Sequence, residues 1–343
     1  MLRIAAALAA SSSLCIANAC EMFEYRHVKA SPHVHVFQAA EGTTAVVNGN
    51  IVAVVGERAV LLVDTGQIPS VARRVLADLR RLSLLPITHI VNTHWHGDHV
   101  LANFVFKEAF PAAKIVAHPH TVERAASFYT DYAAKNRERL PAIIADMGKR
   151  RDASTDPEEK EWLAKTVDCA EKMLPEMEVT KYVAPDVTLE GDMRIDLGGV
   201  TALVRHLGEG NTPGDIVVLV EGDRLVAAGD MIVAPTPYAI GSSLEPWRRT
   251  LAELRKLGAA TFVPGHGPVM RDDVYLRDLD ALFATTYAQL KEMQQKGVSR
   301  KDAESRLDIG AFKARLDTPM KRQAFLQFYV RAAIAQVWPK PPG

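Results

Sequence analysis

The sequence contains few cysteines and no long apolar segment beyond its first residues. Three of the 343 residues are cysteines, and two of these, Cys15 and Cys20, lie within the first twenty positions. A processed chain keeps at most Cys20 and Cys169, too few for a disulfide framework, so Cys169 is expected to be a small apolar side chain. No later run reaches eighteen apolar residues, so no transmembrane segment is predicted.

The chain also lacks a net charge. Its 41 basic and 41 acidic residues cancel, and no global field therefore draws it to nucleic acid or to an anionic membrane. Its 48% apolar and 24% charged residues are ordinary for a globular protein, and a chain of this length can bury a large core. We expect a small-molecule substrate and no nucleic-acid partner.

Residues 1–19 have the features of a secretory signal peptide. Arg3 precedes an alanine-rich apolar run, which ends in Ala17-Asn18-Ala19, an A-x-A cleavage site. This pattern predicts a periplasmic or secreted protein. Cleavage after Ala19 would leave Cys20 first, so lipidation of Cys20 is an alternative, although the preceding residues make a poor lipobox.

Residues 92–99, Asn-Thr-His-Trp-His-Gly-Asp-His, concentrate side chains that bind metals. They follow an apolar segment, residues 87–91, that is typical of a buried strand, and they precede a segment that can start a helix. Eleven histidines in the whole chain should not place three within six positions by chance. Neutral imidazole and carboxylate are common zinc ligands, so this loop predicts a metal site formed by His94, His96, Asp98 and His99.

The remaining pattern indicates an α/β protein with two meanders of strands. The first meander is expected at residues 33–37, 44–47, 51–55 and 59–63, followed by an amphipathic helix over 68–82. After a strand at 114–118, residues 121–178 predict two or three helices, broken near Pro141 and around 152–157.

A second meander follows the helical segment. It is expected to comprise a hairpin over 188–197, a strand at 199–206, a hairpin of 216–220 with 225–228, a helix over 244–257 and a strand at 261–263. Residues beyond about 270 are expected to be mostly helical.

The run from His94 to His99 resembles the His-x-His-x-Asp-His motif of the metallo-β-lactamase superfamily. The resemblance implies an αβ/βα sandwich with the metal site at one end, between two sheets. It implies a core domain over residues 30–270 with a helical insertion at about 121–180, and a helical C-terminal extension over 271–343. Asp64, at the end of the first meander, is expected to hydrogen-bond the metal loop rather than to bind the metal.

The resemblance also implies three further metal ligands later in the chain. Asp230, at the end of a hairpin, and His266, in Gly-His-Gly, match two of them. Asn211 stands where the family usually has histidine, and an amide oxygen is a weaker zinc donor than imidazole. One zinc ion is therefore expected to bind tightly at Asp98, His99, Asp230 and His266, with the His94–His96 site weak or empty. His206 could replace the missing histidine, but strand alternation favours a position beside the site.

The resemblance implies a zinc-dependent hydrolase that uses metal-activated water on an ester, lactone or amide bond, with a β-lactam included. Asp98 is the candidate catalytic base, and Trp95 and Tyr238 are candidates for the pocket wall. A degenerate, non-catalytic metal-binding protein is the main alternative, because of Asn211. A redox di-iron member is the other alternative, although His96 replaces the glutamate that such members carry.

Overall fold

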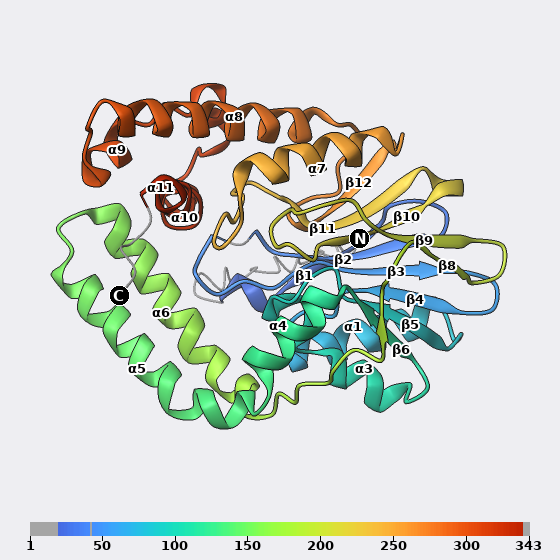
Figure 1. The fold of residues 1–343 in the computed structure, drawn as a ribbon. Helices are drawn as coiled ribbons and strands as arrows, with labels where there is room; N and C mark the ends of the chain where they lie inside the picture. The colour runs from blue at the N-terminus through green and yellow to red at the C-terminus, as the bar shows by residue number, and fades with distance from the viewer. Residues whose placement is uncertain (1–19, 42, 339–343) are drawn as a thin grey trace, which may run out of the picture.

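The computed structural model describes residues 20–41 and 43–338, so the predicted signal peptide lies outside the described residues. Two β-sheets face each other, and helices cover the outer face of each sheet (Figure 1). The chain therefore forms the expected αβ/βα sandwich.

The first sheet has seven strands in the order of the chain. Its first four strands pair antiparallel and its last three extend the sheet in parallel. The strands are β1 (Tyr25–Lys29), β2 (Val34–Ala39), β3 (Ile51–Val55), β4 (Val60–Val63), β5 (Ile87–Val91), β6 (Lys114–Ala117) and β7 (Val187–Thr188).

The second sheet has five strands, in the order β12-β11-β10-β9-β8. Its long strand β11 pairs antiparallel with β10 and parallel with β12, with register shifts after Gly229. The strands are β8 (Met193–Asp196), β9 (Thr201–His206), β10 (Ile216–Val220), β11 (Leu225–Val233) and β12 (Thr261–His266).

The main strands are almost continuously apolar because both faces of each sheet are covered. Along β3, Val52 and Val54 point into the core between the sheets, where they join Val218 of β10. Ile51 and Ala53 point outward, into the core under the helices of the first sheet. This alternation follows from the two-residue period of a strand.

Helices pack on the outer faces. α1 (Pro69–Leu82) and α3 (Asn103–Ala109) contribute to the core outside the first sheet, and α7 (Leu244–Lys256) and α8 (Val274–Gln295) to the core outside the second. The short helix α2 (Gly97–Val100) lies between β5 and α3. The expected C-terminal helices are confirmed as α8, α9 (Arg300–Arg306), α10 (Pro319–Phe325) and α11 (Arg331–Val337), with a π-helical segment, Leu326–Val330, between the last two.

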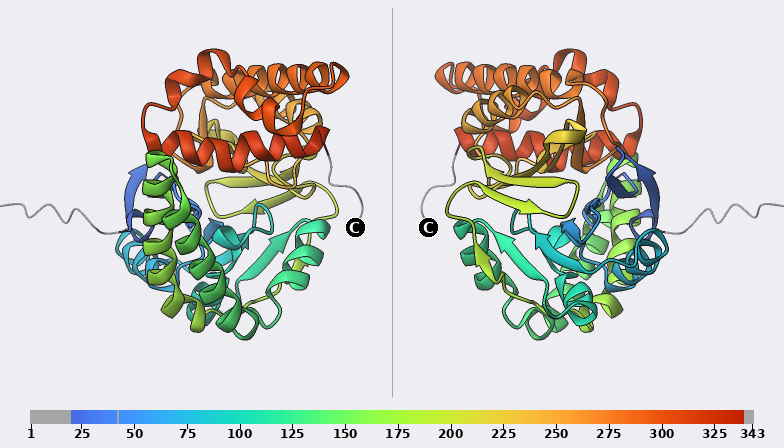
Figure 2. Two further views of the ribbon diagram at one scale, coloured as in Figure 1. Left: turned by 90° about the vertical axis from the view of Figure 1, so that its left-hand side faces the viewer. Right: turned by 90° about the vertical axis from the view of Figure 1, so that its right-hand side faces the viewer.

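A helical insertion separates β6 from β7, as the sequence predicts. It comprises α4 (Pro119–Tyr129), α5 (Tyr132–Ala153) and α6 (Pro157–Glu178). Figure 2 shows these helices, in green, beside the sheets and next to the orange and red C-terminal helices. The break expected near Pro141 is wrong, because Pro141 lies inside α5. The break between α5 and α6 occurs at residues 154–156, within the expected region.

Two other expectations about strands are wrong. Residues 44–47 form bends rather than a strand. Residues 188–197 do not form a hairpin, because β7 pairs with β6 in the first sheet and β8 pairs with β9 in the second. The polar residues 190–192 carry the chain from one sheet to the other instead of turning it back.

A disulfide joins Cys20 to Cys169 of α6, 149 positions along the chain. The expectation that Cys169 only fills space is therefore wrong. Lipidation of Cys20 and this bond are mutually exclusive uses of one sulfur atom, and the structure has the bond. It attaches the insertion to the first described residues, over the core of the first sheet.

Within residues 20–41 and 43–338, no helix combines the length and the apolar character needed to span a membrane.

We expect the Cys20–Cys169 bond to stabilise the fold, because a cross-link between distant residues reduces the entropy of the unfolded chain, by about 2–4 kcal/mol in typical cases. Dithiothreitol should lower the urea midpoint of the oxidised protein accordingly. A Cys20→Ser/Cys169→Ser variant serves as the control, since dithiothreitol should leave its midpoint unchanged. Equal midpoints for the oxidised and reduced protein would contradict the expectation.

Candidate metal centre

The candidate ligands come from the ends of strands in both sheets. His94 and His96 lie in the loop after β5, and Asp98 and His99 lie in α2, directly after it. Asp230 lies in β11, and His266 is the last residue of β12. The two sheets thus bring residues far apart in the sequence to one end of the sandwich.

The six predicted ligands form two adjoining groups. One group contains His94, His96 and Asp230, and the other contains Asp98, His99 and His266; within each group the ligand atoms lie within 4.8 Å of one another. Asp230 contacts both groups: its Oδ2 is 3.7 Å from His94 Nε2 and its Oδ1 is 3.2 Å from His99 Nε2.

The second group is the tighter one. The Asp98 Oδ2 atom is 2.9 Å from His266 Nε2 and 3.3 Å from His99 Nε2. The His266 Nε2 atom is 3.4 Å from Asp230 Oδ1, so all four residues converge. The structure thus brings together the four residues that the sequence assigns to the tight site.

The unsatisfied atoms of these residues fit a cation. His94 Nε2, Asp98 Oδ2 and Asp230 Oδ1 are buried and have no hydrogen-bond partner among the described residues. A buried polar atom without a partner is costly, and imidazole nitrogens with carboxylate oxygens are the donor set of zinc. The residues present therefore suit a zinc ion.

The electrostatic environment favours the ligand forms of His94 and Asp98. Burial, followed by the proximity of His99, holds the pKa of His94 well below its usual value, so its ring is neutral. Burial alone would raise the pKa of Asp98, but the neighbouring imidazoles of His99 and His266 lower it well below its usual value. Both residues are thus ready to donate electron pairs.

Asp64 orients a histidine in each group. His99 Nδ1 donates to Asp64 Oδ2 at 2.8 Å, which leaves Nε2 free to face the site. Thr93 Oγ1 donates to the same oxygen at 2.8 Å and lies 3.0 Å from His94 Nδ1, from which it can accept a hydrogen bond. Asp64 also accepts from Thr93 N, which holds the loop at the end of β5. Such contacts set the tautomer and direction of a ligating ring.

The backbone approaches the site so closely that two positions require glycine. A Cβ atom at Gly265 would lie 2.0 Å from Asp230 Oδ1, and one at Gly229 would lie 2.4 Å from Thr93 Oγ1. Gly229 also has a φ of 52°, which favours glycine. Gly229 lets the second sheet approach the metal loop at Thr93, and Gly265 lets β12 approach Asp230 of β11.

Asn211 has one side-chain atom available for a ligand. Its Nδ2 donates to the Tyr238 carbonyl and its backbone N donates to Asp215 Oδ2 at 2.6 Å. Its Oδ1 is buried and has no partner among the described residues. The role of Asn211 as a weak ligand stays a prediction.

The other predicted site residues lie around the ligands. His206 Nδ1 donates to the Asp215 carbonyl at 2.9 Å, and its ring packs on His118, so His206 belongs to neither ligand group. The Trp95 ring contacts His96 at 4.6 Å between centroids and Phe128 at 4.7 Å. Both contacts place Trp95 at the outer side of the loop.

Tyr238 is half-buried between the site and the C-terminal helices. Its ring centroid lies 5.3 Å from that of His266 and 5.0 Å from that of Phe328. Ala239 N donates to the Phe328 carbonyl at 3.0 Å. The C-terminal extension therefore supports the loop that covers His266.

Sequence reasoning missed two residues here. Thr93 precedes the motif and links Asp64 to His94, and Tyr129 of α4 lies beside Gly97, with its hydroxyl 3.3 Å from the position of a Cβ there. The sequence could have indicated Thr93, because it lies inside the loop that carries the ligands. No sequence pattern indicated Tyr129, because it belongs to the insertion and reaches the site only in the folded chain.

Comparisons with known proteins agree with this geometry. The sequence profile described as the metallo-beta-lactamase superfamily matches residues 44–266. A linear primary-alkylsulfatase from Pseudomonas sp. (strain ATCC 19151) is 22% identical over 216 residues, which cover 60% of this chain and 39% of the relative. The chain thus spans well under two thirds of that relative's length.

Solved structures show the same fold. A metallo-beta-lactamase from Pontibacter korlensis, 18% identical, aligns with a TM-score of 0.54 over 76% of this chain and 99% of its own. An inverting sec-alkylsulfatase from Pseudomonas sp., 15% identical, aligns with a TM-score of 0.63 over 91% of this chain and 50% of its own. The fold, the ligand order and the profile match lead to one conclusion: this chain belongs to the metallo-beta-lactamase superfamily.

Proposed function

We propose that the protein is a zinc-dependent hydrolase that acts on an ester, lactone or amide bond of a small molecule. One observation carries the proposal: Asp98, His99, Asp230 and His266 converge as a buried donor set, and Asp98 also lines a cavity large enough for a substrate. The name of the curated relative, a linear primary-alkylsulfatase, supports an ester-type bond, since an alkyl sulfate is an ester of sulfuric acid.

The chain's own residues have distinct parts in this reaction. A zinc ion held by Asp98, His99, Asp230 and His266 would lower the pKa of a water molecule toward ~7 and polarise the substrate carbonyl. Asp98, at the border of cavity and ligands, takes the proton of the attacking water. The oxygen of that water forms the new bond to the acyl carbon, the bond to the leaving alcohol or amine breaks, and the proton passes to the leaving group. Asp64 holds the ring of His99 throughout.

We also propose that the protein acts outside the cytoplasm. The alanine-rich leader with its A-x-A site supports export. The Cys20–Cys169 disulfide supports it independently, because disulfides persist mainly in oxidising compartments.

Metal analysis tests the prediction that the two ligand groups differ in their affinity for zinc. After dialysis against a weak chelator, the protein should retain about one zinc per chain, because Asn211 gives the first group a weaker donor than histidine. Asn211→His should raise the retained amount toward two. Two tightly held equivalents in the unchanged protein would refute the weak site, and an Asn211→His variant with unchanged zinc would place Asn211 outside the metal shell.

The orienting role of Asp64 has a matched control in the same chain. Asp64→Asn should lower zinc affinity by roughly 10- to 100-fold, because the His99 ring loses its charged partner. Asp223 accepts from His33 Nδ1 at 2.8 Å, in a similar pair outside the two ligand groups. Asp223→Asn should leave zinc affinity unchanged in a competition titration, and an equal loss in both variants would indicate a general effect on folding.

Hydrolysis distinguishes an enzyme from a binding protein. A panel of nitrocefin, lactones, aryl esters, phosphodiesters and aryl sulfates should include a substrate whose turnover requires zinc. Asp98→Ala and His266→Ala should each reduce kcat/KM by more than the ~10- to 100-fold typical of residues that only orient ligands. Asp146→Ala, at an exposed position of α5, should not. Zinc binding without turnover of any class would favour the degenerate binding protein.

A further inference from the structure

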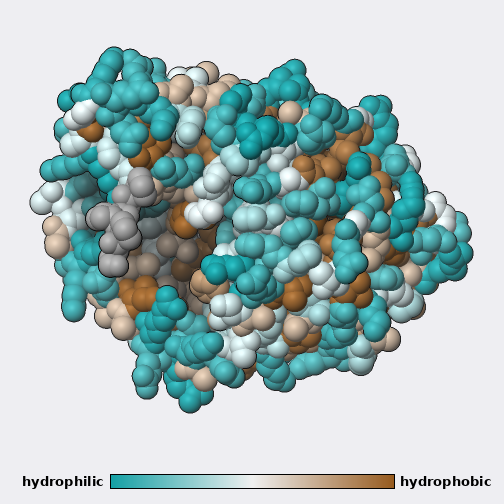
Figure 3. Space-filling model, viewed as in Figure 1, coloured by the Kyte–Doolittle hydropathy of each residue, from teal (hydrophilic) through white to brown (hydrophobic). Residues whose placement is uncertain are grey.

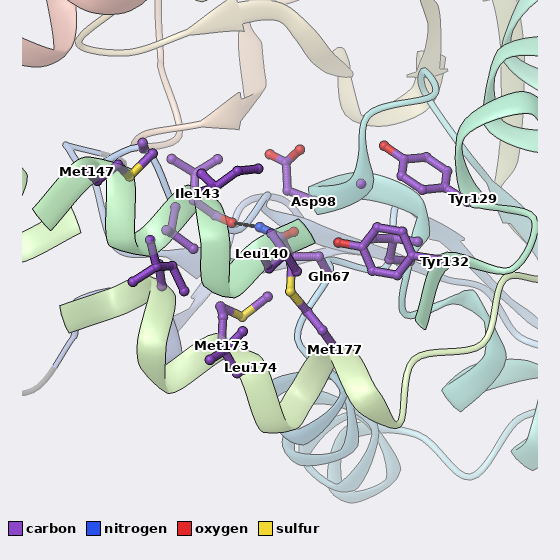
Figure 4. A pocket seen from close by; sticks show the side chains of 17 residues that line it. Gln67, Asp98, Tyr129, Tyr132, Leu140, Ile143, Met147, Met173, Leu174 and Met177 are labelled. Carbon is purple, nitrogen blue, oxygen red and sulfur yellow. Dashed lines mark hydrogen bonds between the residues drawn. The ribbon is translucent and has the colours of Figure 1, made fainter. Parts of the chain in front are cut away.

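An apolar cavity of about 350 Å³ opens beside the metal centre. Side chains of two insertion helices, α5 and α6, form much of its wall (Figure 4). The rest comes from α4, residues 45–47, Gln67 and residues 97–101, with Asp98 among them. In the space-filling view, the surface is hollowed next to the insertion helices, and hydrophobic residues are visible inside the hollow (Figure 3). The apolar side chains from the two helices include Leu140, Ile143 and Met147 of α5, and Met173, Leu174 and Met177 of α6.

Apart from Asp98, the described residues that line the cavity include no charged side chain that could pair with a charged group of a ligand. Tyr129 and Tyr132 lie on the Asp98 side (Figure 4), and burial raises the pKa of Tyr132 to about 12, so its hydroxyl is neutral. Gln67, the remaining polar residue, donates its amide to the Val47 carbonyl. A charged group placed far from Asp98 would be desolvated without compensation.

The walls are attached to the sandwich at several points. Ala170 lines the cavity, and its neighbour Cys169 is bonded to Cys20. Glu176 Oε2 accepts from Ser70 N of α1 at 3.0 Å, and Trp162 Nε1 donates to the Thr43 carbonyl at 2.7 Å. The cavity is therefore a built feature of the fold, and its methionines can adapt to the shape of an apolar guest.

We propose that this cavity binds an uncharged apolar group of the substrate, which extends from the bond hydrolysed at Asp98 along the space between α5 and α6. The proposal rests on the hydrolase function proposed above and narrows it to esters of a long aliphatic or aromatic acid. A dry cavity of about 150 Å³ holds benzene, so this cavity has room for roughly two such rings or a chain of comparable volume. A substrate with a carboxylate at its far end does not fit this environment.

Chain length is the first test. The zinc-loaded protein is given 4-nitrophenyl butyrate, octanoate and, as a charged match in length, the mono-4-nitrophenyl ester of suberic acid. Each buried methylene is expected to raise kcat/KM by up to roughly fourfold, so octanoate, which has four more methylenes, should exceed butyrate by up to about 250-fold. The suberate ester should lose most of this gain. Equal values for butyrate and octanoate would overturn the proposal.

Variants locate the effect in the cavity. Ala170→Trp fills the space and Ile143→Gln makes its wall polar, so each should bring the octanoate-to-butyrate ratio toward one. Ala164→Trp on α6 and Ala145→Gln on α5 place the same side chains at exposed positions and should keep the ratio. Because the ratio compares two substrates of one protein, a partly folded variant does not change it. An unchanged ratio in both cavity variants would overturn the assignment.

A binding measurement separates this proposal from the hydrolase function. N-phenyl-1-naphthylamine, an uncharged apolar fluorophore, should bind the zinc-loaded protein, and decan-1-ol should displace it. Binding that is lost in Ala170→Trp supports the cavity even where no ester is hydrolysed, a result that would overturn ester hydrolysis alone. Ester hydrolysis without binding of the fluorophore would overturn the cavity proposal alone.

Discussion

The buried carboxylate of Asp64 is the interaction on which the metal centre depends. It is 2% exposed, and a carboxylate at that depth is costly unless donors surround it. The donors come from Thr93 and His99, which ties the end of β4 to the loop after β5 and to α2. The same bonds that satisfy Asp64 fix the direction of the imidazoles. One set of hydrogen bonds thus both stabilises the buried carboxylate and orients the candidate metal ligands.

The sandwich and the insertion contribute different parts of the site. Strand ends of both sheets supply the ligands, so the position of each ligand follows from the packing of the two sheets. The insertion, whose three helices lie between β6 and β7, supplies most of the apolar cavity wall. Asp98 is the residue shared by both parts, since it belongs to a ligand group and lines the cavity.

The sequence predicted what depends on local pattern. The ligand motif, the strands β3 and β5 and the helix α1 were recognisable because each depends on the spacing of ligand or apolar side chains within a short run of consecutive residues. The order of Asp230 and His266 became informative through the family resemblance. By contrast, residues 190–192 have the composition of a tight turn, yet they cross between sheets, because β7 and β8 find partners elsewhere in the chain.

Features that depend on distant contacts were not predictable in this way. The bond between Cys20 and Cys169 requires the insertion to fold back over the first sheet, which no local pattern indicates. The cavity depends on how α5 faces α6, and α5 has apolar residues such as Leu140 and Ile143 without a sharply defined buried face. The contact between Tyr238 and Phe328 likewise joins two regions that only the C-terminal packing brings together.

The long spacing of the ligands has a consequence for how the chain is assembled. His99 and His266 are 167 positions apart, yet their Nε2 atoms lie 3.3 Å from each other. A metal ion held between them would link the two halves of the sandwich, at the end where the sheets meet the loops. The disulfide closes a loop of similar length but leaves the second sheet outside it. Such a metal link would require β12 as well as α2, so a metal ion bound at both histidines would stabilise only a chain in which both halves of the sandwich have folded.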